Sequence, residues 1–415
     1  MDVVSVIKNN SEKLNALYSG VDQTARYEKL ADQFRARFNA EPVAFVSAPG
    51  RTEINGNHTD HNKGRVLAAA VNLDTVAAVA PRNDMKVELY SDGYNRPFKV
   101  DLSTLKPVAT EKETTLALIR GVAARMKELG YEIGGFSACV TSTVLKGSGL
   151  SSSAAFEVLL VAIYDALYNG WKVDPQLNAQ ISQYAENVFF GKPCGLMDQM
   201  ASSVGGLVTI DFGPEKPVVE AISYDFGAKG YDVLVVSAGG EHGNLTADYA
   251  AIPAEMKAVA AAMGKEVLCG ITGDELLAAV PALKNKVSDR AILRAFHFAD
   301  ECIRVEKAVK ALREDDIEAF FAAEIASGES SWKLLQNLYV AKSDNQEMCL
   351  ALEISRRMLS GKGAWRIHGG GFAGTILAFV PKAMTAEYRS VMDSIFGQGA
   401  SVVLAVRPEG AVVIK

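Results

Sequence analysis

Strand patterns and helix patterns do not alternate along this chain, and that order constrains its fold more than any single motif does. Apolar residues with helical spacing run through 4–39, and strand-like runs follow at 43–48, where Pro49-Gly50 predicts a stop, and at 65–81. Helical patterns dominate from about 246 to 360, and strand patterns then return. Mixed order of this kind is typical of an α+β layout and argues against a doubly wound sheet.

The length of 415 residues is enough for two or three domains at about 150 residues each. Hydrophobic residues make up 49% of the chain and charged residues 22%, which is ordinary for a globular protein with a core. A weak boundary lies within 211–230. We therefore expect an N-terminal domain over 1–212 and a C-terminal domain over 213–415.

The charge balance argues against a nucleic-acid-binding protein. The net charge is -6, from 43 Lys and Arg against 49 Asp and Glu, and no extended basic run occurs. Nucleic-acid binding needs a basic surface to neutralise phosphates. A local site for an anionic small molecule remains open.

Five dispersed cysteines without a CxxC pair disfavour a disulfide framework or a structural zinc site. The polar N-terminus has no signal-peptide apolar region, and no run of 18 apolar residues occurs. We therefore expect a cytoplasmic protein that does not cross a membrane.

A glycine-serine segment at 146–155 lies between a strand pattern at 135–145 and a strong helix pattern that reaches about Tyr168. Glycines allow several backbone N–H groups to point to one spot, and a helix N-terminus adds positive partial charge. Such a loop can hold phosphate, although the segment does not match a Walker A motif. The alternative is a glycine-rich turn with a serine N-cap.

A second polar cluster follows the first strand. Arg51, Asn57, His58, Asp60 and His61 fall within eleven residues. Arginine suits phosphate or carboxylate, and the other side chains offer the donors and acceptors that a polyhydroxylated ligand needs. A metal site is less favoured because the two histidines lack helical spacing, and a polar turn remains an alternative.

Two further segments contain residues that suit a site. Asp198 stands among glycine and apolar residues in 193–199, a setting in which a carboxylate can be partly buried and catalytic. Its alternative is a helix N-cap, and Glu186 is alternatively a solvated helix residue. The glycines after His368 suggest a close backbone approach to a ligand or loop, or else a hairpin turn.

Read together, these segments resemble the GHMP kinase family and, within it, the galactokinases. Residues 50–64 resemble the signature GRxNxxGEHTDYxxG, and 149–154 are similar to the family phosphate loop. Residues 191–199 are close to GxPCGIMDQ, and 369–374 resemble the third motif. All four occur in family order. The resemblance implies a fold of two α+β domains with the active site in the cleft between them.

The resemblance also implies roles for individual residues. Asp198 would be the catalytic aspartate at the anomeric hydroxyl, and Arg51 would keep it ionised. Magnesium would be held by Ser153 and Glu186. The ATP phosphates would be wrapped by Gly147, Ser148, Gly149, Leu150, Ser151 and Ser152. The sugar would be lined by Asn57, His58, Asp60 and Gly195. A looser match, in the segment that contains His242 and Tyr249, adds Tyr249 as a sugar contact.

Several positions depart from the family pattern. Asn57 replaces the signature glutamate that contacts the 6-hydroxyl, and His61 replaces a tyrosine. His368 replaces a threonine, and Ala373 replaces a glycine. Asparagine can bind a 6-hydroxyl and would also tolerate a 6-carboxylate, which a glutamate would repel. Alternatively, Asn57 faces away from the ligand and only shapes the turn.

The function that the resemblance implies is ATP- and magnesium-dependent phosphorylation of galactose at its anomeric hydroxyl, giving galactose 1-phosphate and ADP. A galactose relative such as galacturonate is the alternative substrate. A non-catalytic sugar sensor is a second alternative, although Arg51, Ser153, Glu186 and Asp198 are all present. A kinase for mevalonate or homoserine has no support from the sugar motifs. The sequence leaves the oligomeric state open.

Overall fold

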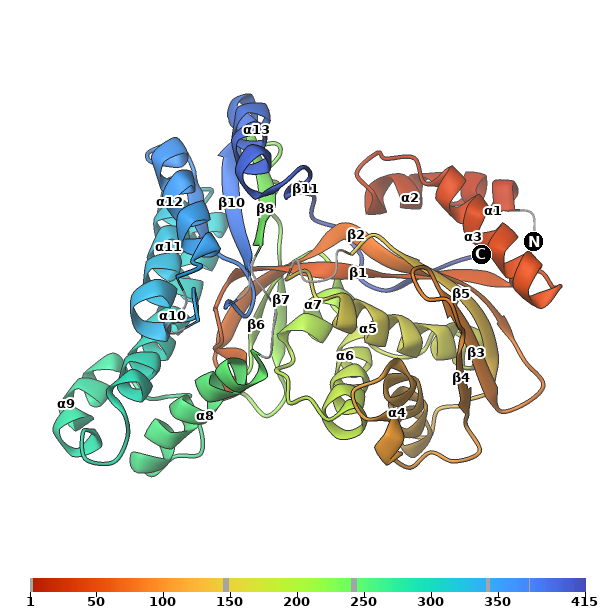
Figure 1. Cartoon of the computed structure of the whole chain (residues 1–415), viewed down its shortest axis with the longest axis horizontal. Helices are drawn as coiled ribbons and strands as arrows, with labels where there is room; N and C mark the ends of the chain where they lie inside the picture. The colour runs from red at the N-terminus through yellow and green to blue at the C-terminus, as the bar shows by residue number, and fades with distance from the viewer. Residues whose placement is uncertain (1–2, 145–148, 240–244, 341–343, 373) are drawn as a thin grey trace.

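The computed structural model describes residues 3–144, 149–239, 245–340, 344–372 and 374–415. Its strands form two sheets that lie side by side, with β1 and β2 crossing the middle of the molecule (Figure 1). No helix within these ranges is long and apolar enough to cross a membrane.

The larger sheet has the order β12-β1-β2-β5-β3-β4, and β6 pairs with β2 and β7 with β6. All neighbours are antiparallel except β3 and β5. The strands are β1 (Ala44–Asn55), β2 (Arg65–Pro81), β3 (Lys86–Ser91), β4 (Phe98–Asp101), β5 (Phe136–Ser142), β6 (Leu207–Asp211), β7 (Val218–Ile222) and β12 (Val412–Ile414).

The two faces of the larger sheet pack against different helices because strand side chains alternate in direction. Ala44 and Val46 of β1 join a core with α4 and α5, whereas Phe45 joins a core with α3. The helices on this part of the chain are α1 (Val3–Asn9), α2 (Ser11–Leu17), α3 (Thr24–Phe38), α4 (Thr115–Glu128), α5 (Ser152–Tyr164), α6 (Pro175–Tyr184) and α7 (Met197–Val204). Figure 1 shows α1–α3 and α4–α6 on opposite sides of the sheet.

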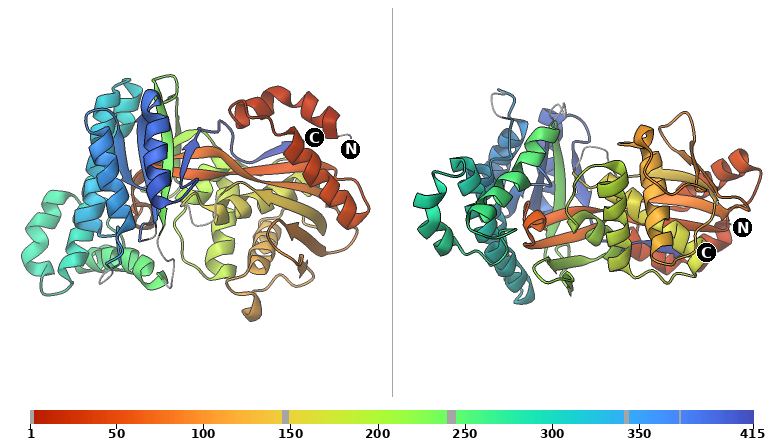
Figure 2. Two further views of the ribbon diagram at one scale, coloured as in Figure 1. Left: turned by 45° about the horizontal axis from the view of Figure 1, so that its top comes forward. Right: turned by 90° about the horizontal axis from the view of Figure 1, so that it is seen from below.

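The smaller sheet has the antiparallel order β11-β8-β10-β9. Its strands are β8 (Tyr231–Gly239), β9 (Ala364–Ile367), β10 (Gly374–Pro381) and β11 (Ser401–Leu404). The helices of this part are α8 (Thr246–Ala262), α9 (Gly273–Leu283), α10 (Asp289–Arg313), α11 (Ile317–Ser330), α12 (Glu347–Leu359) and α13 (Thr385–Phe396). They gather at the end of the molecule opposite α1–α3 (Figure 2).

Helices α5, α6 and α11 each continue into a π-helical turn, and three 3₁₀ turns occur elsewhere in the described chain. The π-helical turns are η3 (Asp165–Asn169), η4 (Ala185–Phe190) and η5 (Ser331–Leu335). The 3₁₀ turns are η1 (Asp60–Asn62), η2 (Ala109–Glu111) and η6 (Lys382–Met384). π-Helical turns are rare and often lie at functional sites.

The division into 1–212 and 213–415 stays a prediction, and the sheets do not change at that point. β7 and β12 both lie beyond residue 212, yet both belong to the larger sheet. The chain therefore passes to the smaller sheet after Ile222 and returns to the larger one at Val412.

The expected end of the first strand at Pro49-Gly50 is wrong. β1 continues to Asn55, with a shift of register between Pro49 and Arg51. A β-bulge absorbs a proline and a glycine without ending the strand. A side chain at Gly50 would lie 2.8 Å from the Leu150 carbonyl oxygen, so glycine lets the loop before α5 approach the strand. This approach brings Arg51 to the candidate site.

Candidate active site

Arg51 and Asp198 form an ion pair at the start of α7. Arg51 Nε lies 2.8 Å from Asp198 Oδ1, and Arg51 Nη2 lies 2.7 Å from the same oxygen. The Arg51 side chain is buried, whereas 33% of the Asp198 side chain is exposed. The aspartate is the second residue of α7 and not its N-cap, which is Leu196. A buried guanidinium therefore holds a carboxylate that remains open to a reactant.

The loop before α5 contacts both members of this pair. The Ser151 hydroxyl donates to Asp198 Oδ2, and the Gly149 carbonyl accepts from Arg51 Nη1. Arg51 N donates to the Leu150 carbonyl at 3.1 Å. The structure thus places Gly149, Leu150 and Ser151 in contact with the Arg51–Asp198 pair, and Ser152 follows as the first residue of α5. Gly147 and Ser148 lie outside the described residues.

The carboxyl of Asp198 stays ionised at neutral pH. Burial raises its pKa, but the charge of Arg51 and hydrogen bonds from Ser151 and Arg51 outweigh burial and lower the pKa below its usual value. An ionised carboxylate can accept a hydrogen bond from a hydroxyl group and orient it.

Glu186 lies in η4 and is buried, so the interpretation as a solvated helix residue is wrong. Gln199 Nε2 donates to Glu186 Oε2 at 2.9 Å and to Glu157 Oε2 at 3.0 Å. Lys192 Nζ lies 3.4 Å from Glu186 Oε1. Burial and the neighbouring Glu186 raise the pKa of Glu157 well above its ordinary value. Sequence reasoning missed both Glu157 and Gln199, although Gln199 directly follows Asp198.

Ser153 and Glu186 fit a magnesium ion by donor chemistry. Magnesium prefers hard oxygen donors, and it usually binds few protein groups together with water and substrate phosphates. A carboxylate and an exposed hydroxyl supply such donors. In the described chain, no group of three or more His, Cys, Asp or Glu side chains is arranged to hold a metal, and this holds for His58, Asp60 and His61.

Asp60 and Gly195 pack against one another. A methyl group on Gly195 would lie 1.7 Å from Asp60 Oδ2, so only glycine fits there. Asp60 begins η1, and the backbone N–H of His61 donates to its Oδ1 at 3.0 Å. Gly195 lies three residues before Asp198. The structure therefore brings Asp60 close to the segment that bears the candidate catalytic aspartate.

His58 and Tyr249 both contact the glycine run after β9. His58 Nε2 lies 2.9 Å from the Gly370 carbonyl, and the Tyr249 hydroxyl donates to the Gly371 carbonyl at 2.6 Å. Burial and neighbouring His61 lower the pKa of His58 to about 4, so its imidazole is neutral at neutral pH. The third motif thus joins residues from both parts of the chain. His242 and Ala373 lie outside the described residues.

The side-chain amide of Asn57 is fully hydrogen-bonded within the protein. Its Nδ2 donates to Glu53 Oε1 at 2.9 Å and to the Gly369 carbonyl at 2.7 Å. Its Oδ1 accepts from Asn337 at 2.9 Å and from Ser331 at 3.3 Å. An amide has two donors and accepts at two positions, so these contacts use its capacity. This arrangement supports the alternative in which Asn57 shapes the turn.

Glu53 is the carboxylate beside Asn57 that sequence reasoning missed. It is buried, and Arg366 Nη2 lies 3.0 Å from its Oε1. The signature GRxNxxGEHTDYxxG has asparagine at the position of Glu53 and glutamate at that of Asn57. The acid and the amide are therefore exchanged in this chain, four residues apart and in direct contact.

Comparisons with known proteins show which family the chain belongs to. The model of the galactokinase galactose-binding signature matches residues 32–81, and that of the GHMP kinases N terminal domain matches residues 117–206. The chain is 32% identical over 381 residues to a galactokinase of Streptomyces coelicolor, covering 89% of this chain and 93% of that protein. The chain belongs to the galactokinase family.

Other galactokinases and their structural relatives extend this result. Homo sapiens galactokinase is 30% identical over 396 residues, covering 92% of this chain and 95% of the human protein. Lactococcus lactis galactokinase in complex with galactose has a TM-score of 0.82 at 22% identity, covering 93% of this chain and 99% of that one. A mevalonate kinase has a TM-score of 0.61 at 15% identity, covering 88% and 99%. The two-domain α+β GHMP kinase fold expected from the sequence is confirmed.

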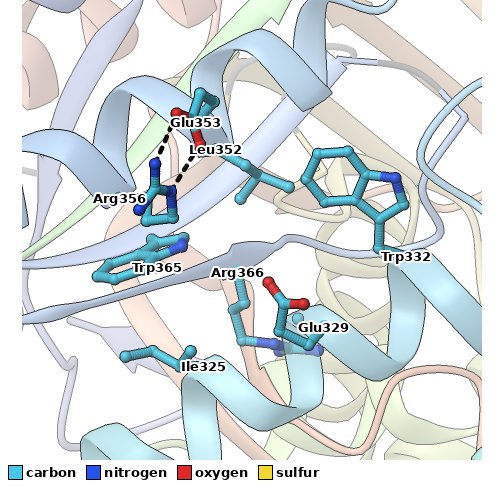
Figure 3. A pocket seen from close by; sticks show the side chains of 9 residues that line it. Ile325, Glu329, Trp332, Leu352, Glu353, Arg356, Trp365 and Arg366 are labelled. Carbon is cyan, nitrogen blue, oxygen red and sulfur yellow. Dashed lines mark hydrogen bonds and ion pairs between the residues drawn. The ribbon is translucent and has the colours of Figure 1, made fainter. Parts of the chain in front are cut away.

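A separate pocket of this galactokinase-family chain lies between α11, α12 and β9 (Figure 3). It shares no residue with the candidate active site. Trp332 and Trp365 line it together with Arg356, which pairs with Glu353 on the same helix. Arg366 lines the pocket and also reaches Glu53, so it joins the pocket wall to the signature strand.

Proposed function

We propose that this chain transfers the γ-phosphoryl group of ATP to the anomeric hydroxyl of galactose, giving galactose 1-phosphate and ADP. The arrangement of Arg51, Asp198 and Ser151 carries this proposal. It combines an ionised, partly exposed carboxylate with a loop at a helix N-terminus, in a chain of the galactokinase family. Phosphoryl transfer depends mainly on alignment and charge stabilisation, which these groups supply.

Asp198 accepts a hydrogen bond from the anomeric hydroxyl and directs its oxygen at the γ-phosphorus. The oxygen–phosphorus bond forms as the bond to ADP breaks, and the hydroxyl proton passes to Asp198 or to the transferred phosphoryl group. Because Arg51 lowers the pKa of Asp198, the carboxylate acts more by positioning than as a strong base. Arg51 also stabilises negative charge that develops during transfer.

Backbone N–H groups at the N-terminal end of α5 favour the ATP phosphates. Ser153 and Glu186 would hold magnesium, which neutralises phosphate charge when it is bound. The proposed sugar contacts are Asp60, Gly195, His58 and Tyr249. Asn57 contributes through the turn that it stabilises, and its closed hydrogen bonds offer no contact that favours a 6-carboxylate.

A kinase assay with ATP and magnesium over galactose, galacturonate, arabinose, fucose and N-acetylgalactosamine tests this proposal. We expect galactose to have the highest kcat/KM. Faster turnover of galacturonate than of galactose would show that the proposed phosphoryl transfer occurs but that galacturonate is the substrate. Sugar binding by calorimetry without turnover of any sugar would favour the sensor alternative.

We also propose a cytoplasmic location, which the five unpaired cysteines support. Cell fractionation with an antibody against the chain tests it. Recovery in a membrane or secreted fraction would contradict it.

A further inference from the structure

His368 stands at the end of β9 and reaches across to the signature strand β1. Its ring is buried, and its Nε2 lies 3.0 Å from Thr52 Oγ1 and 3.3 Å from the backbone nitrogen of Glu53. Its own backbone N–H donates to the Thr375 carbonyl at 3.0 Å, which fixes the root of the side chain. The residue is therefore held at its backbone and at Nε2 of its ring.

These contacts decide which ring nitrogen carries the proton. The backbone N–H of Glu53 can only donate, so Nε2 of His368 accepts. In a neutral imidazole the proton then resides on Nδ1. The Nδ1 edge faces the loop before α5, because a methyl group built on Gly149 would lie 2.8 Å from Nδ1.

Gly149 also contacts the candidate catalytic pair. Its carbonyl accepts from Arg51 Nη1, and Arg51 Nε binds Asp198. A shift of Gly149 toward the space of the ring would move the acceptor that orients the guanidinium. Gly149 has φ +70°, so glycine suits both its backbone and the close approach of the ring.

We propose that His368 is a positioning residue that supports Gly149 and thereby holds Arg51 and Asp198 in line for phosphoryl transfer. This inference rests on the proposed kinase activity. The family pattern has threonine at this position, and a threonine side chain stops two bonds short of the imidazole Nε2. The longer His368 side chain therefore reaches from the third motif to the loop before α5. It also links the smaller sheet to the larger one through Thr52.

Two substitutions separate this role from simple stabilisation. His368→Gln places an acceptor near the position of Nε2, so it keeps the contacts to Thr52 and Glu53 and removes the ring from Gly149. His368→Asn places an amide near the position of Nδ1, so it keeps a group beside Gly149 and loses the acceptor for Glu53. We expect the Gln variant to have the higher Tm and the Asn variant to have the higher kcat.

The magnitude expected for His368→Gln is a roughly tenfold or greater loss of kcat, because small misplacements of reacting groups cost up to about 10²-fold. Its KM for galactose should stay within about twofold. Tyr388→Phe in α13 removes a buried hydrogen bond to Ser355 Oγ of α12 and serves as the control that lowers Tm without changing kcat.

The affinity for a nonhydrolysable ATP analogue, measured by calorimetry, provides the same comparison without turnover. We expect His368→Gln to weaken it at least about fivefold and His368→Asn to weaken it less. The inference would be overturned if kcat and affinity rank the two variants in the same order as Tm does. It would also be overturned if both quantities in the Gln variant stay within twofold of the wild type. An inactive wild type would instead overturn the proposed function, and the affinities would still decide the role of His368.

Discussion

Arg51 and Asp198 are separated by 147 positions in the chain, yet two nitrogens of the guanidinium lie within 2.8 Å of one carboxylate oxygen. Arg51 comes from a strand of the larger sheet and Asp198 from the first turn of α7. The exposed edge of the carboxylate is the group that we assign to the sugar hydroxyl.

Asp198→Asn should lower kcat by at least about 10²-fold, because the amide cannot supply the charge that orients and polarises the hydroxyl. Asp84→Asn is the matched control, since Asp84 is an exposed carboxylate whose partner is Arg82. Steady-state kinetics and circular dichroism of both variants check the expectation. An Asp198 variant with near wild-type kcat would rule out the catalytic assignment.

Removal of divalent metal should abolish turnover, and Glu186→Gln should raise the magnesium concentration needed for half-maximal rate by roughly tenfold. The reason is that the substitution removes the one carboxylate of the proposed donor set. Magnesium titrations at saturating ATP and galactose measure this shift. Glu128→Gln, at the exposed end of α4, should leave the titration unchanged. Full activity in excess chelator would contradict a metal requirement.

Asn57→Glu should destabilise the protein. In the wild type, the Asn57 amide donates to Glu53 Oε1 at 2.9 Å, and the substitution replaces this donor with a second carboxylate. An uncompensated buried charge costs about 3 kcal/mol. The double variant Glu53→Asn, Asn57→Glu restores one acid and one amide, as in the family signature. It should recover at least half of the decrease in Tm that Asn57→Glu causes.

The same variants test the role of Asn57 in choice of substrate. If Asn57 only shapes the turn, the ratio of kcat/KM for galactose and galacturonate should not change in the double variant. A rise of roughly tenfold in favour of galactose would show that this position contacts C6 of the sugar, as the sequence hypothesis held.

The stability of the protein should depend on pH through Glu324 of α11. Burial raises its pKa to about 8, against the opposing charge of Arg366, while Glu301 and Glu53 raise it further and a hydrogen bond from Asn55 lowers it. Between its ordinary pKa and about 8, the folded state keeps a proton that the unfolded state releases. The free energy of unfolding therefore falls as pH rises through this window, by at most about 1.4 kcal/mol per pH unit.

Thermal melts of wild type and Glu324→Gln from pH 5 to pH 9 measure this effect. The Tm of the variant should rise relative to the Tm of the wild type as pH rises, and this difference should become constant above about pH 8. Glu329→Gln on the same helix is the control, because Glu329 is exposed and pairs with Lys333. A constant difference in Tm across the range would exclude the Glu324 assignment.

The order of the main elements and the family could be predicted from the amino-acid sequence. The glycine-serine segment before a long apolar helix, and the run that contains Asp198, are short patterns whose meaning depends on neighbouring residues. Their order along the chain predicted the GHMP kinase fold that the comparisons confirmed. The Pro49-Gly50 pair was misread because a bulge and a strand end use the same residues.

Which of these residues meet could not be predicted from the sequence, because it depends on how the whole chain packs. The burial of Glu186, the closed hydrogen bonds of Asn57 and the contact of His368 with Gly149 join segments from distant parts of the chain. Local periodicity shows which face of a helix or strand is buried. It does not show which distant segment packs against that face, so it gives no distance between the two segments. A buried polar group must also find its partners wherever packing brings them, and those partners are set by the whole fold.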